Sequence, residues 1–263
     1  MSVMRKNNVR VSGQGNRPIL FAHGYGGDQS MWRYVAPAFE ADCRVVLFDH
    51  AGFGQSAPAS YDPHAYDTLE QYAADVLAIC TELRLDDVVF VGHSVSAMIG
   101  VLAANAAPRQ FARLVLIGPS PCYIDEGDYV GGFSRADIDG LLDFLDDNFV
   151  GWSQAMAPVI MGNAERPELG AELQASFCRA HRAAARQFAR ATFLSDTRAA
   201  LGQVDVPALI LQCSDDAIAP ASVGRYVHRA MPRSTLVQLR ATGHCPNLSA
   251  PDETIAAIRA WLG

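Results

Sequence analysis

The chain has 263 residues, 50% of them hydrophobic, and its 28 acidic and 21 basic side chains give a net charge of −7. This length is enough for one domain with a sizeable core, and the acidic balance argues against nucleic acid or an anionic membrane as a partner. The sequence contains no uncharged apolar run of about 18 residues, which argues against a membrane-spanning helix.

Strand-like and helix-like patterns alternate along the chain. Short apolar runs predict strands, which we place at residues 8–12, 18–22, 43–49, 88–91, 114–117, 206–213 and 234–239. Helical patterns occupy residues 69–83, the stretch after the fourth strand, and residues 253–262. Alternating strands and helices are typical of an α/β fold, so we expect a doubly wound, mostly parallel sheet.

One block of helical character interrupts this alternation between the fifth and sixth strands. Four helices are predicted there, at residues 135–146, 149–161, 167–179 and 183–194. Ser134 and Pro167 stand where a helix cap and a first turn belong. We expect residues 121–199 to form a four-helix cap inserted into a core made of residues 1–120 and 200–263.

The motif with the clearest chemistry runs from Gly92 to Ser96. It lies between an apolar strand and an apolar helix, with Ser94 at the apex of the turn. This is the pattern of a nucleophile elbow, in which a strained backbone pushes the serine hydroxyl out of the sheet. Ser96 replaces the usual last glycine, but it is still a small side chain. The alternative is an ordinary polar turn between a buried strand and a buried helix.

A nucleophilic serine needs a histidine to take its proton and a carboxylate to orient that histidine. His244 follows the last predicted strand, and Asp215 and Asp216 follow the one before it. The order Ser, Asp, His is that of α/β-hydrolases. We favour Asp216 over Asp215, because Ile218 and Pro220 follow it with the spacing that resembles the acid loop of α/β-hydrolases, where the loop turns toward the histidine. Asp215 is expected to cap the turn or face water. A carboxylate after the fifth strand is ruled out, since the sequence there is Gly-Pro-Ser.

An oxyanion hole and a pocket complete the expected site. The backbone N–H groups of Tyr25, in the glycine-rich loop after the second strand, and of Val95 would bind the developing negative charge. We expect Tyr25, Phe133, Trp152, Phe193 and Ile218 to line the pocket. Phe144 and Phe177 are expected to join the cap to the core, and His93 to pack beneath the elbow.

The sequence predicts neither a metal site nor a cofactor. The six cysteines are scattered and form no C-x-x-C pair, so we interpret them as buried free thiols. Gly52-Phe53-Gly54 lacks the lysine of a phosphate loop and the surroundings of a dinucleotide fingerprint. The polar N-terminus has no apolar signal-peptide core, and we expect a cytoplasmic protein.

Several segments together resemble the RsbQ-type α/β-hydrolases of bacteria, to which the strigolactone and karrikin receptors of plants are also similar. The matching segments are HGYGGDQSMW at residues 23–32, FDHAGFG at 48–54, GHSV at 92–95, GPSPCY at 118–123, GGF at 131–133 and GHCP at 243–246. The chain departs from the bacterial pattern at His23 and Ser96. The resemblance implies a four-helix cap, a small lipophilic pocket, and Ser94, Asp216 and His244 as the triad.

The resemblance leaves the biological role open, because the group contains both enzymes and sensors. One hypothesis is a hydrolase of a small neutral lipophilic ester or lactone, favoured by the intact triad. The other is a ligand-sensing protein that, like RsbQ, activates a PAS-domain phosphatase in a stress pathway, with hydrolysis as part of sensing. A perhydrolase or a carbon–carbon bond hydrolase is a third class on the same scaffold.

Overall fold

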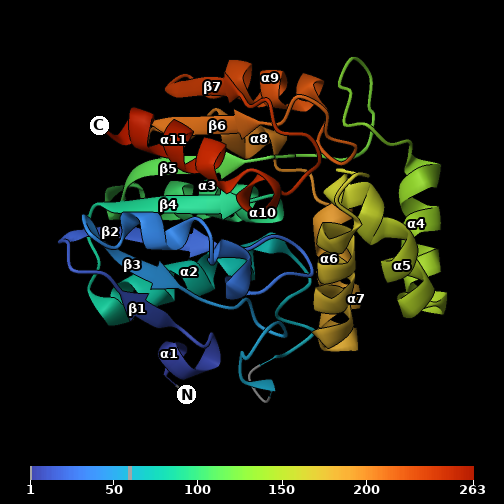
Figure 1. The fold of residues 1–263 in the computed structure, drawn as a ribbon, viewed down its shortest axis with the longest axis horizontal. Helices are drawn as coiled ribbons and strands as arrows, with labels where there is room; N and C mark the ends of the chain where they lie inside the picture. The colour runs from blue at the N-terminus through green and yellow to red at the C-terminus, as the bar shows by residue number, and fades with distance from the viewer. Residues whose placement is uncertain (1, 59–60) are drawn as a thin grey trace.

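The computed structural model describes residues 2–58 and 61–263, and in these residues the centre of the protein is a seven-stranded sheet (Figure 1). The strand order is β1-β3-β2-β4-β5-β6-β7. β1 pairs antiparallel with β3, and the other neighbouring strands pair parallel. The strands are β1 (Arg10–Ser12), β2 (Arg17–Ala22), β3 (Cys43–Leu47), β4 (Val88–His93), β5 (Phe111–Ile117), β6 (Ala208–Gln212) and β7 (Ser234–Gln238).

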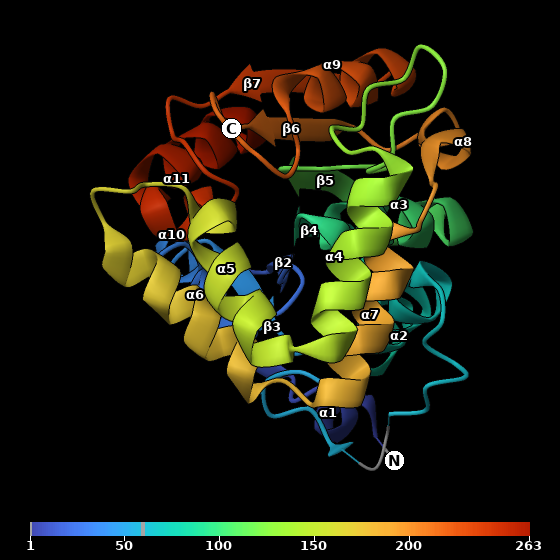
Figure 2. The same ribbon diagram turned by 90° about the vertical axis from the view of Figure 1, so that its right-hand side faces the viewer.

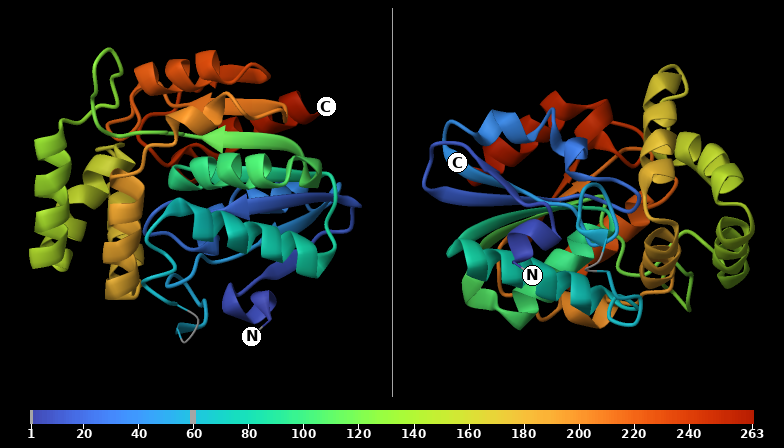
Figure 3. Two further views of the ribbon diagram at one scale, coloured as in Figure 1. Left: turned by 180° about the vertical axis from the view of Figure 1, so that it is seen from behind. Right: turned by 90° about the horizontal axis from the view of Figure 1, so that it is seen from below.

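Helices cover both faces of the sheet, as Figure 3 shows, and this explains why the central strands are apolar on both sides. One face carries α2 (Leu69–Leu83), α3 (Val95–Ala106) and α9 (Ala221–Ala230), and the other carries α11 (Pro251–Leu262). The shorter helices are α1 (Val3–Lys6), η1 (Gln29–Trp32), η2 (Ala36–Phe39), η4 (Pro108–Gln110), α8 (Arg198–Leu201) and α10 (Pro246–Ser249). No helix among the described residues is long and apolar enough to cross a membrane.

Four helices between β5 and β6 stand beyond the end of the sheet as a separate layer (Figures 1 and 2). They are α4 (Arg135–Asp147), α5 (Phe149–Met161), α6 (Pro167–Arg179) and α7 (Arg182–Phe193). Helix α5 packs along α6, and α4 packs against α7. We call α4–α7 the cap. The cap covers the loops that follow the strands, where the predicted site residues lie.

The predicted helix ends in the cap are confirmed to within two residues. Ser134 caps α4 through a reciprocal capping box with Asp137, and Pro167 is the first residue of α6. Two expectations about single side chains were wrong. Phe144 lies on the outward face of α4 with 41% of its surface exposed, so it does not join the cap to the core. Cys178 on α6 is exposed, whereas the other five cysteines are buried.

Close packing between β4 and α3 fixes the position of the turn that joins them. A Cβ atom on Gly100 of α3 would lie 2.3 Å from the ring of Phe90 on β4, and one on Gly92 would lie 2.4 Å from the carbonyl oxygen of Ser96. Glycine at both positions lets the helix lie directly on the strand. The turn between them therefore holds Ser94 at the end of the strand, facing the cap.

Candidate active site

Ser94 has the strained backbone that a nucleophile elbow requires. Its φ of 57° and ψ of −126° lie in a region that residues other than glycine seldom adopt. The turn is held by hydrogen bonds from Ser94 N to Ile117 O and from Ala97 N to Ser94 O, each 2.8 Å long. Two neighbouring elements thus maintain the conformation that turns the hydroxyl away from the sheet.

A continuous hydrogen-bonded chain joins Ser94, His244 and Asp216. The Nε2 atom of His244 lies 2.7 Å from Ser94 Oγ, and its Nδ1 atom lies 2.8 Å from Asp216 Oδ2. An ionised carboxylate can only accept, so Nδ1 carries the proton and Nε2 is free to accept from the serine hydroxyl. All three residues are buried. The arrangement can move a proton from serine to histidine without a change of geometry.

The surroundings of Asp216 keep its carboxylate ionised. Burial acts to raise the pKa of Asp216, but His244 and the backbone N–H groups of Ala219 and Ile218 outweigh it, and the pKa lies below its ordinary value. Those two N–H groups donate to Oδ1 over 3.0 and 2.9 Å, which leaves Oδ2 for His244. Asp215 is exposed, and its backbone carbonyl accepts from Gly243 N. The structure thus brings Asp216, and not Asp215, to His244.

The backbone of His244 is held on two sides. Its carbonyl oxygen accepts from His93 Nε2 over 2.7 Å, and its N–H donates to Ile160 O of the cap over 2.8 Å. His93 is buried beneath the elbow, as expected, and touches the histidine only through this backbone contact and ring packing. It therefore positions His244 without joining the hydrogen-bonded chain to Ser94.

Two backbone N–H groups near Ser94 are free to bind an anion. Those of Tyr25 and Val95 donate to no residue that the structure describes, and Val95 begins the twelve-residue helix α3, whose dipole favours negative charge at that end. Gly24 and Gly26 allow the loop to approach closely. A Cβ on Gly24 would lie 2.6 Å from His93 Nδ1, and one on Gly26 would lie 1.9 Å from the ring of Phe177. Phe177 thus joins cap and core, as expected.

Ser96, at the position where the motif usually has glycine, belongs to a buried polar network. Its hydroxyl donates to the carbonyl of His23 over 2.5 Å and accepts from His50 Nε2 over 2.7 Å. His23 in turn accepts from the backbone N–H of His50 at Nε2 and donates from Nδ1 to the carbonyl of Gly24. The network ties the elbow to the loop that presents Tyr25. The sequence did not reveal it, because its members are far apart along the chain.

Acid sensitivity follows from three buried histidines whose pKa burial lowers. Burial lowers the pKa of His23, lowers that of His50 well below its ordinary value, and lowers that of His93 to about 3. In the unfolded chain these groups take up protons below about pH 6.5. Between pH 6.5 and the lower pKa values of the folded protein, the unfolded chain binds more protons than the folded one. The free energy of unfolding therefore falls as the pH falls.

We expect the free energy of unfolding to drop by about 3 kcal/mol between pH 7.5 and pH 5.5, because the neutral rings of His50 and His93 each contribute about 1.4 kcal/mol of that loss, to which the lowered pKa of His23 adds. Urea unfolding at both pH values measures it. The variant His181→Gln, whose imidazole is exposed, serves as the control and should show the same dependence. Equal stability at the two pH values would contradict the lowered pKa values of the three histidines.

A narrow cavity lies beside Ser94, between the core and the cap. The centre of a water-sized sphere can occupy only about 30 Å³ of it. The described residues that line it include no lysine, arginine, aspartate or glutamate. They are Gly24, Tyr25, Met31, His93, Ser94, Tyr123, Ile160, Leu173, Thr192, Phe193, Ile218, His244 and Cys245.

Of the five residues expected to line the pocket, three lie in the wall of this cavity and two do not. Tyr25, Phe193 and Ile218 line the cavity, but Phe133 and Trp152 do not. Trp152 is fully buried behind the cavity, where its ring packs on those of Tyr25 and Phe177 at 5.9 and 5.2 Å.

Phe133 lies beside the cavity wall and supports it through its backbone. Its N–H donates to Tyr123 O over 3.2 Å, and its carbonyl accepts from Asp125 N over 2.8 Å. Sequence reasoning missed Tyr123 and Thr192 as lining residues. The position of Tyr123 could have been predicted, since this tyrosine comes soon after the end of β5, on the side of the sheet where the site lies.

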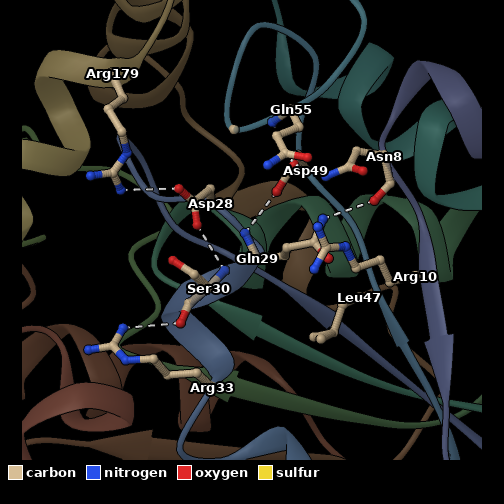
Figure 4. A pocket seen from close by; sticks show the side chains of 11 residues that line it. Asn8, Arg10, Asp28, Gln29, Ser30, Arg33, Leu47, Asp49, Gln55 and Arg179 are labelled. Carbon is tan, nitrogen blue, oxygen red and sulfur yellow. Dashed lines mark hydrogen bonds and ion pairs between the residues drawn. The ribbon is translucent and has the colours of Figure 1, made fainter.

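A second hollow, shown in Figure 4, has different chemistry. It lies beside residues 28–30, which follow the loop of Tyr25, and both of its aspartates have partners. Asp28 pairs with Arg179 at 3.2 Å, and Asp49 accepts from the backbone N–H groups of Gln29 and Gln55 at 2.8 Å. A Cβ on Gly54 would lie 2.4 Å from the Asp49 carboxylate, so this glycine serves a turn around Asp49. The hollow contains none of the proton-transferring residues.

Comparison with known proteins agrees with this geometry. The model of the alpha/beta hydrolase family matches residues 19–257. A probable esterase of Oryza sativa subsp. japonica is 38% identical over 258 residues, which cover 97% of this chain and 95% of that protein. The karrikin insensitive 2 receptor CA of Petunia hybrida is 37% identical over 257 residues, with coverage of 97% and 95%.

A solved structure of a hydrolase from Oleispira antarctica superposes with a TM-score of 0.97 at 38% identity, covering 99% of this chain and 96% of that one. The expected fold and the similarity to plant receptors are therefore confirmed. The extent of the family match and the identity to these relatives over nearly the whole chain place this protein in the alpha/beta hydrolase family.

Proposed function

We propose that this protein is a serine hydrolase that cleaves a small neutral ester or lactone through an acyl-enzyme on Ser94. The observation that carries the proposal is the buried chain from Ser94 through His244 to Asp216, with distances of 2.7 and 2.8 Å, at the wall of an apolar cavity. The names of the relatives, which include an esterase and a hydrolase, support the same class of reaction.

The proposed reaction follows from the positions of these groups. His244 Nε2 takes the proton of Ser94 as Oγ attacks the carbonyl carbon, and Asp216 stabilises the imidazolium that forms. The backbone N–H groups of Tyr25 and Val95 bind the oxyanion. His244 then protonates the leaving oxygen, and the C–O bond breaks. Water repeats the sequence on the acyl-enzyme and restores the serine.

Substrate size and charge follow from the cavity wall. Apolar side chains such as Met31, Leu173 and Ile218 favour neutral ligands, because burial of apolar surface stabilises binding by about 25 cal/mol per Å². A charged ligand would lose its hydration without gaining an ionic partner from any described lining residue. The narrow space favours short acyl groups.

A series of 4-nitrophenyl esters tests this proposal. We expect kcat/KM for acetate and butyrate to exceed that for decanoate by at least about tenfold. The long acyl chain does not fit the narrow cavity, and a poorer fit of an apolar group in a pocket lowers kcat/KM by about that factor. The hydrogen succinate ester, which carries a carboxylate, should be hydrolysed no faster than in buffer alone. A preference for decanoate or for the anionic ester would refute the picture of a small apolar pocket.

The similarity to a protein named as a receptor favours a second candidate. In this alternative the cavity binds a small lipophilic ligand, and the loaded protein activates a partner, which the RsbQ resemblance suggests is a PAS-domain phosphatase. The discriminating measurement is the activity of a PAS-domain phosphatase encoded beside this gene, with and without this protein. If no phosphatase gene lies beside this one and the protein turns over an ester rapidly and repeatedly, the enzyme hypothesis is favoured over the sensor hypothesis.

A further inference from the structure

Two hydroxyl groups in the cavity wall are buried without a hydrogen-bond partner. Tyr123 and Thr192 are each 1% exposed, and neither Tyr123 Oη nor Thr192 Oγ1 has a hydrogen-bond partner of good geometry within 2–58 and 61–263. The side chain nearest to bonding Tyr123 Oη is the hydroxyl of Ser94, which acts to lower the pKa of this phenol against the larger effect of burial. Both residues line the cavity that contains Ser94 and His244. A buried hydroxyl without a partner destabilises the folded protein, so each of these groups is available to a polar atom of an occupant.

The two hydroxyls come from different layers of the molecule. Tyr123 belongs to the segment after β5 in the core, and Thr192 belongs to α7 in the cap. The ring of Phe193, the next residue after Thr192, lies 5.0 Å from the ring of Tyr123. The threonine hydroxyl also makes no bond to the helix backbone, which is the usual partner of a buried helical threonine. Cap and core therefore each offer one polar group to an otherwise apolar wall.

Neither hydroxyl is needed for the proposed bond cleavage. The ester carbonyl oxygen is assigned to the N–H groups of Tyr25 and Val95, and the leaving oxygen to His244. A third unpartnered atom, His93 Nδ1, also belongs to a lining residue, but it faces the Cα of Gly24, where a Cβ would come within 2.6 Å. Only Tyr123 and Thr192, among the described residues, remain to meet a further polar atom.

We propose that Tyr123 and Thr192 are specificity residues that bind a second oxygen function of the substrate. The preferred substrates are then small neutral esters or lactones that carry an additional hydroxyl, ether or carbonyl oxygen besides the two oxygens of the scissile ester. This inference rests on the proposed hydrolase function and narrows its substrate class. Both hydroxyls can donate to such an oxygen, and burial keeps the phenol of Tyr123 protonated by raising its pKa.

A pair of isosteric esters tests this inference. The 4-nitrophenyl ester of 3-hydroxybutyrate differs from that of 3-methylbutyrate only by a hydroxyl in place of a methyl group. With each rate divided by that of hydrolysis in buffer, we expect the wild-type protein to favour the hydroxy ester in kcat/KM by roughly tenfold. Equal values, or a preference for the methyl ester, overturn the inference.

Single variants assign the contact. Thr192→Val and Tyr123→Phe each remove one hydroxyl with little change of shape, and at least one of them should abolish the preference by lowering only the rate on the hydroxy ester. Thr192→Ser should retain it. Thr197→Val is the matched control, because that buried hydroxyl bonds to Pro121 O, outside the cavity. An unchanged preference in both Thr192→Val and Tyr123→Phe would contradict the assignment.

Binding to the Ser94→Ala variant separates this inference from the hydrolase function. Calorimetry with the two esters should give tighter binding of the hydroxy ester, and Thr192→Val or Tyr123→Phe in the same background should remove the difference. If wild-type protein hydrolyses neither ester while this difference in affinity persists, the hydrolase proposal fails and the specificity assignment stands. If hydrolysis occurs with no difference in rate or affinity, the assignment fails and the hydrolase proposal stands.

Discussion

Replacing Ser94 by alanine is expected to lower kcat for 4-nitrophenyl acetate by about 10³- to 10⁴-fold or more. The hydroxyl is held 2.7 Å from His244 Nε2, and no other described hydroxyl shares that partner. Without it, only binding and the N–H groups of Tyr25 and Val95 remain to promote attack by water. Steady-state kinetics and mass spectrometry of the trapped acyl-enzyme measure the effect.

Ser234→Ala is a suitable control for that experiment. Ser234 begins β7, and its hydroxyl bonds to the carbonyls of His228 and Met231, in a part of the molecule that contributes nothing to the cavity. This variant should keep kcat within about twofold of wild type, as remote surface changes usually do. If Ser94→Ala retains most of the esterase activity, Ser94 is not the nucleophile.

The second large effect distinguishes the two adjacent aspartates. Asp216→Asn is expected to lower kcat by about 10⁴-fold, because an amide in place of the carboxylate stabilises the wrong tautomer of His244. Asp215→Asn should change kcat by less than about twofold, since that side chain is exposed and makes no contact with His244. The two variants differ by one position and remove the same charge, so each controls for the other.

Thermal unfolding should accompany this comparison, because Asp216 also accepts from the N–H groups of Ile218 and Ala219. An asparagine can still accept these bonds through its side-chain oxygen, so we expect Asp216→Asn to fold. Mild and similar losses of activity in both variants would place the essential acid elsewhere in the chain.

Much of the fold could be predicted because its signals are local. Helix α5 was predicted with the bounds that the structure has, and Ser134 and Pro167 marked the starts of α4 and α6. The order of Ser94, Asp216 and His244 along the chain was sufficient to bring them together in an α/β-hydrolase sheet. Here the carboxyl ends of neighbouring parallel strands meet at one edge, and each residue follows its own strand.

The lining of the cavity could not be predicted in the same way. A cap helix packs against other cap helices and against the core, so its periodicity shows which residues are buried but not which neighbour they face. Trp152 and Phe193 illustrate this, since both are buried, yet only Phe193 reaches the cavity. Phe144 is also an aromatic residue of a cap helix, but its side chain is exposed on the outward face of α4.

The sequence by itself determined the sheet, the cap and the order of the three residues proposed to act in catalysis, because periodicity, caps and strand-end residues are properties of short segments. Only the tertiary structure decided which polar groups are paired. Ser96 is paired through His23 and His50, whereas the hydroxyls of Tyr123 and Thr192 are not. Whether a buried hydroxyl has a partner depends on every atom around it, and those atoms come from segments that meet only when the cap folds onto the core.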